Sequence, residues 1–177
     1  MGGDFENDYN TFEKAVMETI EHGLVDDAVI GKDEKEQLNI WGIREDVAVL
    51  AEEKKFDQQF DISIPVAQIG EVIDKIIIEL KNCKGVETIF PFGHVADGNI
   101  HFIIGKNSDD DDLKSNINEI IYSNTELVKG SISAEHGIGL DKKKYLIKSR
   151  SKDEIELMRL IKKSIDPKNI LNPGRVF

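Results

Sequence analysis

The chain has 177 residues, of which 40% are hydrophobic, so it is long enough to bury one substantial core. Its formal net charge of −11 opposes binding to nucleic acid, because a phosphate backbone requires clustered lysine and arginine side chains. No apolar run approaches the roughly 20 residues of a membrane span, and the first residues lack the charged-then-apolar order of a secretory signal, so we expect a cytoplasmic protein.

Two helices are predicted at the start of the chain. Apolar residues recur on one helical face over residues 9–22, and Gly23 ends that helix. A second, more polar helix is predicted from residue 34 to residue 53. Its apolar stripe is irregular, so residues 42–45 are a candidate break within it.

A strand follows, because Phe60, Ile62 and Ile64 alternate with polar side chains over residues 59–64, and Pro65 closes it. This alternation predicts one buried face and one polar face.

The next predicted elements are a helix and a hairpin. Apolar residues repeat at helical spacing over residues 69–80. Two short β-rich runs, residues 86–92 and 100–105, flank a loop containing Asp97 and Gly98, which is a favourable turn pair. We therefore expect these runs to pair as antiparallel strands.

A helix over residues 113–128 and a short strand over residues 131–134 complete a β-α-β-β-α-β order. That order predicts an α+β fold, a ferredoxin-like split βαβ antiparallel sheet with its helices on one face, plus N-terminal and C-terminal helical segments. No repeat or Pro/Gly linker divides the chain, so residues 1–177 are predicted to form a single domain.

A last helix is predicted over residues 153–165. Its apolar positions Ile155, Met158, Leu160 and Ile161 are expected to point inward.

Three of the four histidines lie in two glycine-bearing stretches, residues 92–101 and 133–139. His94 and His101 are seven residues apart, a spacing that would place them on opposite faces of one continuous strand. A turn at Gly98 removes that obstacle by folding the backbone between them. Both rings can then reach one ion.

The second stretch supplies the neighbours Glu135 and His136, whose side chains diverge in an extended backbone. Glu135 can therefore complete a His-His-Glu shell for a divalent metal while His136 faces a reacting molecule as a base. Gly137 and Gly139 can permit close approach of a ligand or cofactor. The alternative is that these are ordinary loop and core histidines, with glycines that serve turns.

Five segments resemble the C-terminal domain of FAD-linked oxidases of the vanillyl-alcohol-oxidase type. That group contains D-lactate dehydrogenase, glycolate oxidase and D-2-hydroxyglutarate dehydrogenase. The segments are residues 39–45, 61–65, 93–101, 131–139 and 166–174.

The resemblance implies that His94, His101 and Glu135 bind a divalent metal, commonly zinc, with manganese or iron as alternatives. It also implies that His136 is the general base and that Arg44 holds the substrate carboxylate. A metal would lower the pKa of the substrate hydroxyl, and a hydride would pass to FAD.

Gly137 and Asn172 are expected to contact the FAD, which a separate domain would bind for the most part. The chain shows no resemblance to that FAD-binding domain or to the first strand of the substrate domain. We therefore expect a fragment that is inactive alone and acts with an FAD-binding domain or subunit. The electron acceptor is not identified, and a homodimer is left open.

Several residues depart from the pattern of the hydroxyglutarate-oxidising members. Ala48, Gln59 and Ile103 stand where those members carry Thr, Lys and Asn. Losing these groups should cost a dicarboxylate about 1 to 3 kcal/mol per missing charged contact, which favours a D-lactate-like monocarboxylate. Ala96 also replaces a usual glycine, which is tolerable unless the position requires a positive φ.

Two functions of different classes follow from these observations. The first is the substrate- and metal-binding portion of a flavin-dependent D-2-hydroxy-acid dehydrogenase. The second is a non-catalytic ferredoxin-like metal- or ligand-binding module with a regulatory or scaffolding role. A zinc hydrolase is disfavoured, because the helical His-Glu-x-x-His arrangement is missing.

Overall fold

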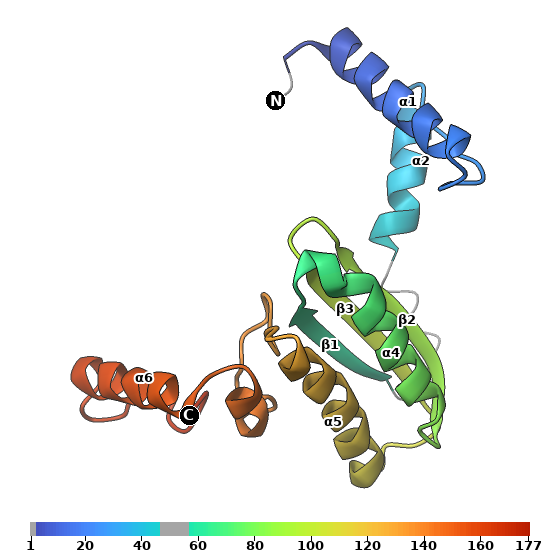
Figure 1. Ribbon diagram of the computed structural model, residues 1–177. Helices are drawn as coiled ribbons and strands as arrows, with labels where there is room; N and C mark the ends of the chain where they lie inside the picture. Colours follow the sequence, from blue (N-terminus) through green and yellow to red (C-terminus); the bar gives the residue numbers. More distant parts are fainter. Residues whose placement is uncertain (1–2, 47–56) are drawn as a thin grey trace. The chain divides into compact units, whose positions relative to one another are not determined.

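The computed structural model describes residues 3–46 and 57–177. The chain divides into two compact units, Met1–Ala48 and Val49–Phe177. Figure 1 labels the elements of both units. The prediction of a single domain stays a prediction.

The N-terminal unit contains two helices, α1 (Phe5–Glu21) and α2 (Glu34–Glu45). An aspartate caps each helix by accepting a backbone N–H from its first turn. Neither helix has a buried residue. The first helix is confirmed, and α2 ends at the predicted break, whereas residues 47–53 of the longer predicted helix fall in the range 47–56, which lies outside the described residues.

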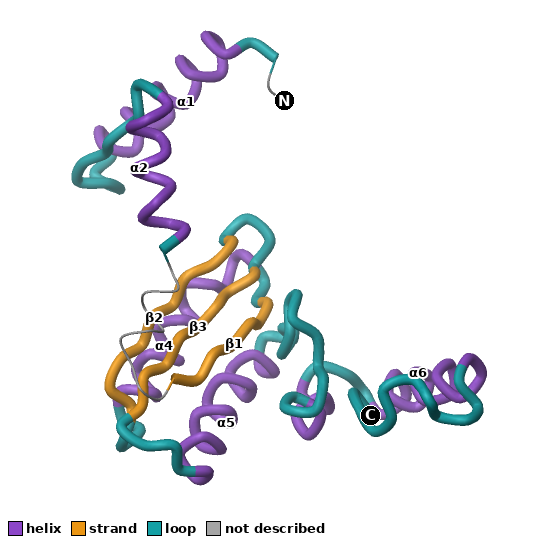
Figure 2. The backbone as a smooth tube through the Cα atoms, turned by 180° about the vertical axis from the view of Figure 1, so that it is seen from behind, coloured by secondary structure: helices purple, strands orange, loops and turns teal. Residues whose placement is uncertain are grey.

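The C-terminal unit is built on a three-stranded antiparallel sheet of order β1-β3-β2. Its strands are β1 (Asp57–Ser63), β2 (Val86–His94) and β3 (Asn99–Lys106). Helices α4 (Ile69–Lys81) and α5 (Asp111–Leu127) lie side by side on one face of the sheet, which Figure 2 shows from the opposite side. The predicted α+β class and hairpin are confirmed.

The predicted strand over residues 131–134 is reduced to one bridge. Ser63 and Ser131 exchange two backbone hydrogen bonds of 2.9 and 3.0 Å, on the free edge of β1. Gly130 allows this approach, because an added Cβ would overlap the carbonyl oxygen of Ser63. Beyond Ser131 the chain leaves the strand path, and the N–H groups of residues 134–136 point to the side chain of Asp61 on β1. The spatial order is still that of a split βαβ sheet.

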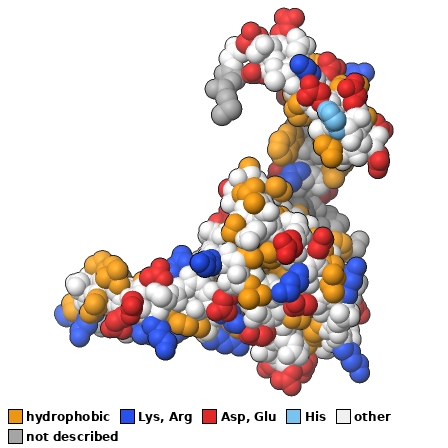
Figure 3. Space-filling model, in the orientation of Figure 1, with side chains coloured by type: hydrophobic (Ala, Val, Ile, Leu, Met, Phe, Trp, Pro, Cys, Tyr) orange, Lys and Arg blue, Asp and Glu red, His pale blue; other side chains and the backbone are white. Residues whose placement is uncertain are grey.

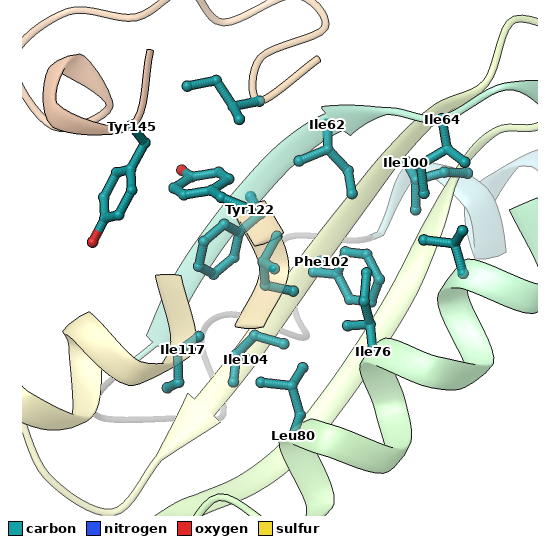
Figure 4. Close-up of a cluster of buried hydrophobic side chains, with 14 of the residues drawn as sticks. Ile62, Ile64, Ile76, Leu80, Ile100, Phe102, Ile104, Ile117, Tyr122 and Tyr145 are labelled. Carbon is teal, nitrogen blue, oxygen red and sulfur yellow. The ribbon is translucent and has the colours of Figure 1, made fainter. Parts of the chain in front are cut away.

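The core lies between the sheet and its two helices, and Figure 4 shows the side chains that meet there. Alternate residues of β3, namely Ile100, Phe102 and Ile104, point into it, as the period of a strand requires. The intervening residues His101 and Ile103 therefore face the other side of the sheet. The most completely buried apolar side chains of the core are Ile62, Ile76, Leu80, Ile100, Phe102, Ile104, Ile117, Ile121 and Ile132.

The C-terminal segment contains a short 3-10 helix, η2 (Lys143–Lys148), and α6 (Lys152–Ile165), which begins with a capping box. Ile155 is buried, but Leu160 and Ile161 are 56% and 51% exposed. The prediction that these two residues point inward is therefore wrong, because periodicity identifies an apolar face but not a surface that covers it. Figure 3 shows hydrophobic side chains at the surface over the α6 segment.

Among the residues that the structure describes, no helix is both long enough and apolar enough to cross a bilayer.

Candidate metal and proton-transfer site

The β2–β3 hairpin forms one half of the site. His94 pairs with Asn99 across the hairpin, and the turn between them closes with a hydrogen bond of 3.1 Å from the Gly98 N–H to the His94 carbonyl oxygen. The Asp97 carboxylate accepts the Asn99 N–H at 3.0 Å. As the sequence predicts, the turn folds the backbone so that the rings of His94 and His101 lie edge to face, with centroids 5.7 Å apart.

The left-handed conformation of this turn is at Gly98, whose φ is +79°. Ala96 is not among the residues of positive φ, so the methyl group that replaces a usual glycine is tolerated. The Gly98 carbonyl accepts the Ile64 N–H at 2.9 Å, and an added Cβ at Gly98 would overlap the Ile64 carbonyl oxygen. The turn is therefore fastened to the end of β1.

The second half of the site is the loop that follows the Ser131 bridge. Asp61 lies opposite His101 in the β1–β3 pairing and is completely buried. Its Oδ2 atom accepts three consecutive backbone N–H groups, from Ala134 at 3.0 Å and from Glu135 and His136 at 2.9 Å each. One carboxylate of β1 thus holds the loop that carries the two predicted functional side chains.

The two halves meet at His101. Its Nε2 atom lies 3.4 Å from Oε1 of Glu135, and its Nδ1 atom lies 3.8 Å from Oδ1 of Asp61. The ring of His136 stacks on that of His101 with centroids 5.9 Å apart. Potential ligand atoms of these four residues all lie within 4.8 Å of one another.

This group lacks one member of the predicted ligand set, His94, and contains two residues outside it, Asp61 and His136. The sequence gives His94, His101 and Glu135 as ligands, with His136 as the base. The geometry gathers His101, Glu135 and His136 with Asp61, while His94 lies against the His101 ring outside that group. The assignment of the ligands stays a prediction.

The site is buried on the strand side and open on the loop side. The side chain of His101 is 15% exposed, whereas those of Glu135 and His136 are 50% and 61% exposed. Burial lowers the pKa of His101, and the charges of Asp61 and Glu135 only partly offset that effect. A neutral imidazole is the form that binds metals.

The pKa of Asp61 is lowered despite its burial. Burial by itself raises this pKa, but hydrogen bonds from the backbone of His136 and Glu135, with the charges of His136 and Lys142, lower it further than burial raises it. The ammonium group of Lys142 lies 3.9 Å from Oδ2 of Asp61 and donates to Oγ of Ser133 at 2.9 Å. Asp61 is therefore an ionised carboxylate at neutral pH.

Two buried oxygens at the site accept no hydrogen bond from the residues that the structure describes. They are Oδ1 of Asp61 and Oδ1 of Asn99, whose amide nitrogen donates to Glu135. Imidazole nitrogens beside carboxylate oxygens suit Zn²⁺, Mn²⁺ and Fe²⁺. The residues present therefore fit a divalent cation.

Asp61 was not predicted as a site residue. The only signals for it in the sequence are its place on the polar face of the predicted strand and in the segment of residues 61–65 that carries the family resemblance.

The other predicted site residues are Arg44, Gly137 and Asn172. Arg44 is in the last turn of α2, in the N-terminal unit, so its position relative to the histidines is not defined. Gly137 has a φ of +79° with no atom within 4 Å of an added Cβ, and Asn172 has a φ of +46°. Their assignment to cofactor contact stays a prediction.

The fold and the site together define a class: an α+β domain with a histidine–carboxylate cluster at the hairpin end of its sheet. Comparison with known proteins gives the particular family. The family model for FAD linked oxidases, C-terminal domain, matches residues 2–176, and the chain belongs to that family. The resemblance stated from the sequence is confirmed.

Three relatives are named D-2-hydroxyglutarate dehydrogenase, two of them as mitochondrial. The Arabidopsis thaliana protein is 35% identical over 99% of this chain and 31% of its own length. The Danio rerio protein is 33% identical over 99% of this chain and 33% of its own length. The protein of Stutzerimonas stutzeri strain A1501 is 35% identical over 94% of this chain and 36% of its own length. The chain thus spans about a third of the length of these relatives.

Proposed function

We propose that this chain is the substrate- and metal-binding portion of a flavin-dependent dehydrogenase that oxidises a D-2-hydroxy acid to the 2-oxo acid. The observation that supports the proposal is the meeting of His101 with Glu135 and His136, because an imidazole and a carboxylate can bind a cation and the neighbouring imidazole can accept a proton. Membership of the FAD-linked oxidase family and the names of the relatives support the same reaction class.

His94, His101 and Glu135 would hold the divalent cation, with zinc as the first candidate and manganese or iron as alternatives. When bound, such a cation lowers the pKa of the substrate hydroxyl and FAD accepts the hydride from the α-carbon. The lowered pKa of His101 favours the neutral ring that this role requires.

His136 would take the proton of the substrate hydroxyl. Its Nδ1 atom lies 3.9 Å from the Asp61 carboxylate, which would favour the proton on Nδ1 and leave Nε2 as the acceptor. His136 would take the hydroxyl proton, and FAD would supply the acceptor for the hydride of the α-carbon, so that the products would be the 2-oxo acid and reduced flavin. Arg44 would hold the substrate carboxylate through a bidentate pair.

The substrate class is proposed from Gln59 and Ile103, a cross-strand pair next to the site. Gln59 and Ile103 are partners across β1 and β3, two residues along from the Asp61–His101 pair and on the same face of the sheet. The side-chain amide of Gln59 donates to Asp57 at 2.7 Å, and Ile103 is apolar. Neither side chain can neutralise a second carboxylate, which supports a D-lactate-like monocarboxylate over 2-hydroxyglutarate.

The test is reconstitution with an FAD-loaded binding domain or subunit from the same organism. We expect D-lactate, but not L-lactate, to remove the absorbance of oxidised flavin under anaerobic conditions, and D-2-hydroxyglutarate to act poorly. Failure of every 2-hydroxy acid with the cation and FAD both bound would overturn the proposal in favour of a non-catalytic binding module. A cytoplasmic location remains a prediction, since two of the relatives are named as mitochondrial.

A further inference from the structure

Asp61 contacts both halves of the site, and its own side chain is fully buried. Its Oδ2 atom accepts the N–H groups of three consecutive residues, 134–136, and the hydroxyl of Ser133 at 3.3 Å. Consecutive N–H groups that point at one anion form a concave anion-binding site. Here the anion is a side chain 74 positions away from Glu135.

We propose that Asp61 is the positioning residue of this site: its carboxylate fixes the conformation of residues 133–136 and so sets Glu135 and His136 against His101, without itself binding the cation. The consequence for metal binding rests on the proposed function, whereas the control of the loop does not.

The hydrogen bonds argue that Asp61 organises the loop and is not a ligand. Oδ2 already accepts three backbone N–H groups, more than its two lone pairs, so only Oδ1 has an open position, and that atom lies beside Nδ1 of His101. Asp61 is fully buried behind the pair, whereas Glu135 and His136 are half exposed or more on the side from which a substrate can enter. A ligand can therefore reach the site from the side of Glu135 and His136, and not from the side of Asp61.

The second oxygen of Asp61 can orient His101. Oδ1 has no hydrogen-bond donor among the described residues and lies 3.8 Å from Nδ1 of His101. A carboxylate behind one ring nitrogen favours the tautomer with the proton on that nitrogen, which leaves the other for a metal. The other nitrogen, Nε2, is the one that faces Glu135. Asp61 therefore contacts both the His101 ring on the strand and the backbone of residues 134–136 in the loop.

The first experiment measures amide hydrogen exchange in the metal-free full chain. Asp61→Ala should speed exchange of the amides of residues 134–136 by about 10- to 100-fold, because their charge-assisted acceptor is lost. Asp166→Asn is the matched control. Asp166 is 8% exposed and accepts the N–H groups of Ile170 and Leu171, away from the histidines.

The control should leave the exchange of residues 134–136 unchanged. If Asp61→Ala fails to fold, as judged by circular dichroism, Asp61→Asn takes its place, and the same three amides should exchange faster. Unchanged exchange in a folded Asp61 variant would overturn the proposal, whatever reaction the chain supports.

The second experiment uses Co²⁺ as a spectroscopic probe of the ligands. Asp61→Asn should bind Co²⁺ with the absorption spectrum of the unchanged chain and with an affinity lower by about 10- to 100-fold, the usual effect of losing a residue that orients a ligand. An altered spectrum with unchanged amide exchange would make Asp61 a ligand and overturn the proposal. If the unchanged chain binds no Co²⁺, the exchange experiment alone decides the proposal, and only the proposed function fails.

Discussion

The two halves of the site are positioned by different means. His94 and His101 stand on paired strands, where the backbone ladder and the turn between them fix both rings. Glu135 and His136 stand on an irregular loop that is held by the buried carboxylate of Asp61. A ladder spreads its effect over many hydrogen bonds, whereas three consecutive N–H groups of the loop share one side-chain acceptor. The loop half should therefore be more sensitive to single substitutions remote in sequence.

The largest effect is expected on the cation itself. His94→Ala, His101→Ala and Glu135→Ala should each abolish binding of about one zinc, manganese or iron ion per chain, because each removes one ligand. Elemental analysis after dialysis measures this. His22→Ala is the matched control, since His22 caps α1 and bonds to Glu18 in the N-terminal unit.

Metal analysis of these variants also tests which residues are the ligands. Retention of the ion in His94→Ala together with its loss in His136→Ala would show that residues of the group gathered by the geometry, and not the predicted set, bind the ion.

A second substitution separates the two roles within the loop half. His136→Ala should leave the cation in place while turnover of the reconstituted enzyme falls by about 10²- to 10⁴-fold, because a general base is lost. Metal content and single-turnover flavin reduction are measured on the same sample. Loss of the ion along with turnover would make His136 a ligand.

The strand half could be predicted from the sequence, and the organisation of the loop half could not. Alternation along residues 59–64 and the Asp97–Gly98 pair predict the paired strands and the turn that brings His94 to His101. The same alternation places Asp61 on a polar face, but the partners of that face come from a loop far along the chain. Local patterns carry no information about such contacts, which also explains the wrong prediction for the apolar face of α6.

The strand half should also set substrate preference. Gln59→Lys combined with Ile103→Asn should raise the ratio of kcat/KM for D-2-hydroxyglutarate over D-lactate by about 10-fold or more, because a cation and an amide then line the row beside His101. Gln59→Glu with Ile103→Asn is the control of opposite charge. An equal gain in both double variants would show that this row does not contact the substrate.

Two glycines with the same φ allow the backbones of the two halves to be compared. Gly98 in the turn and Gly137 in the loop both have φ +79°, but an added Cβ would overlap the Ile64 carbonyl oxygen only at Gly98. Gly137→Ala should cost about 1 to 2 kcal/mol of unfolding free energy from its conformation alone. Gly98→Ala should cost about 1 to 3 kcal/mol more, because the overlap forces the strands apart.

Urea unfolding of the two glycine variants gives the difference directly. Equal costs at the two positions would mean that the turn can move away from β1, and the strand half would then be no more rigid than the loop half.

The smallest effect is expected where η2, which follows the loop, contacts α5. Nζ of Lys148, at the end of η2, lies 2.8 Å from Oε1 of Glu119 and 3.4 Å from Oε2 of Glu126. Lys148→Met should cost about 0.2 to 1 kcal/mol, because Glu119 and Glu126 are largely exposed, and the cost should shrink in high salt. Lys163→Met in α6 controls for the lost charge.

The cost of Lys148→Met should also depend on pH. The hydrogen bond from Lys148 lowers the pKa of Glu119 below 4.5. Its stabilisation is therefore present above pH 4.5 and is lost as the pH falls through the lowered pKa. Urea unfolding at neutral and acidic pH should show the variant and the unchanged chain converging in acid. If the cost persists in acid and in high salt, the aliphatic part of the Lys148 side chain packs η2 against α5. The segment that follows the loop would then be held by apolar contacts and not by charge.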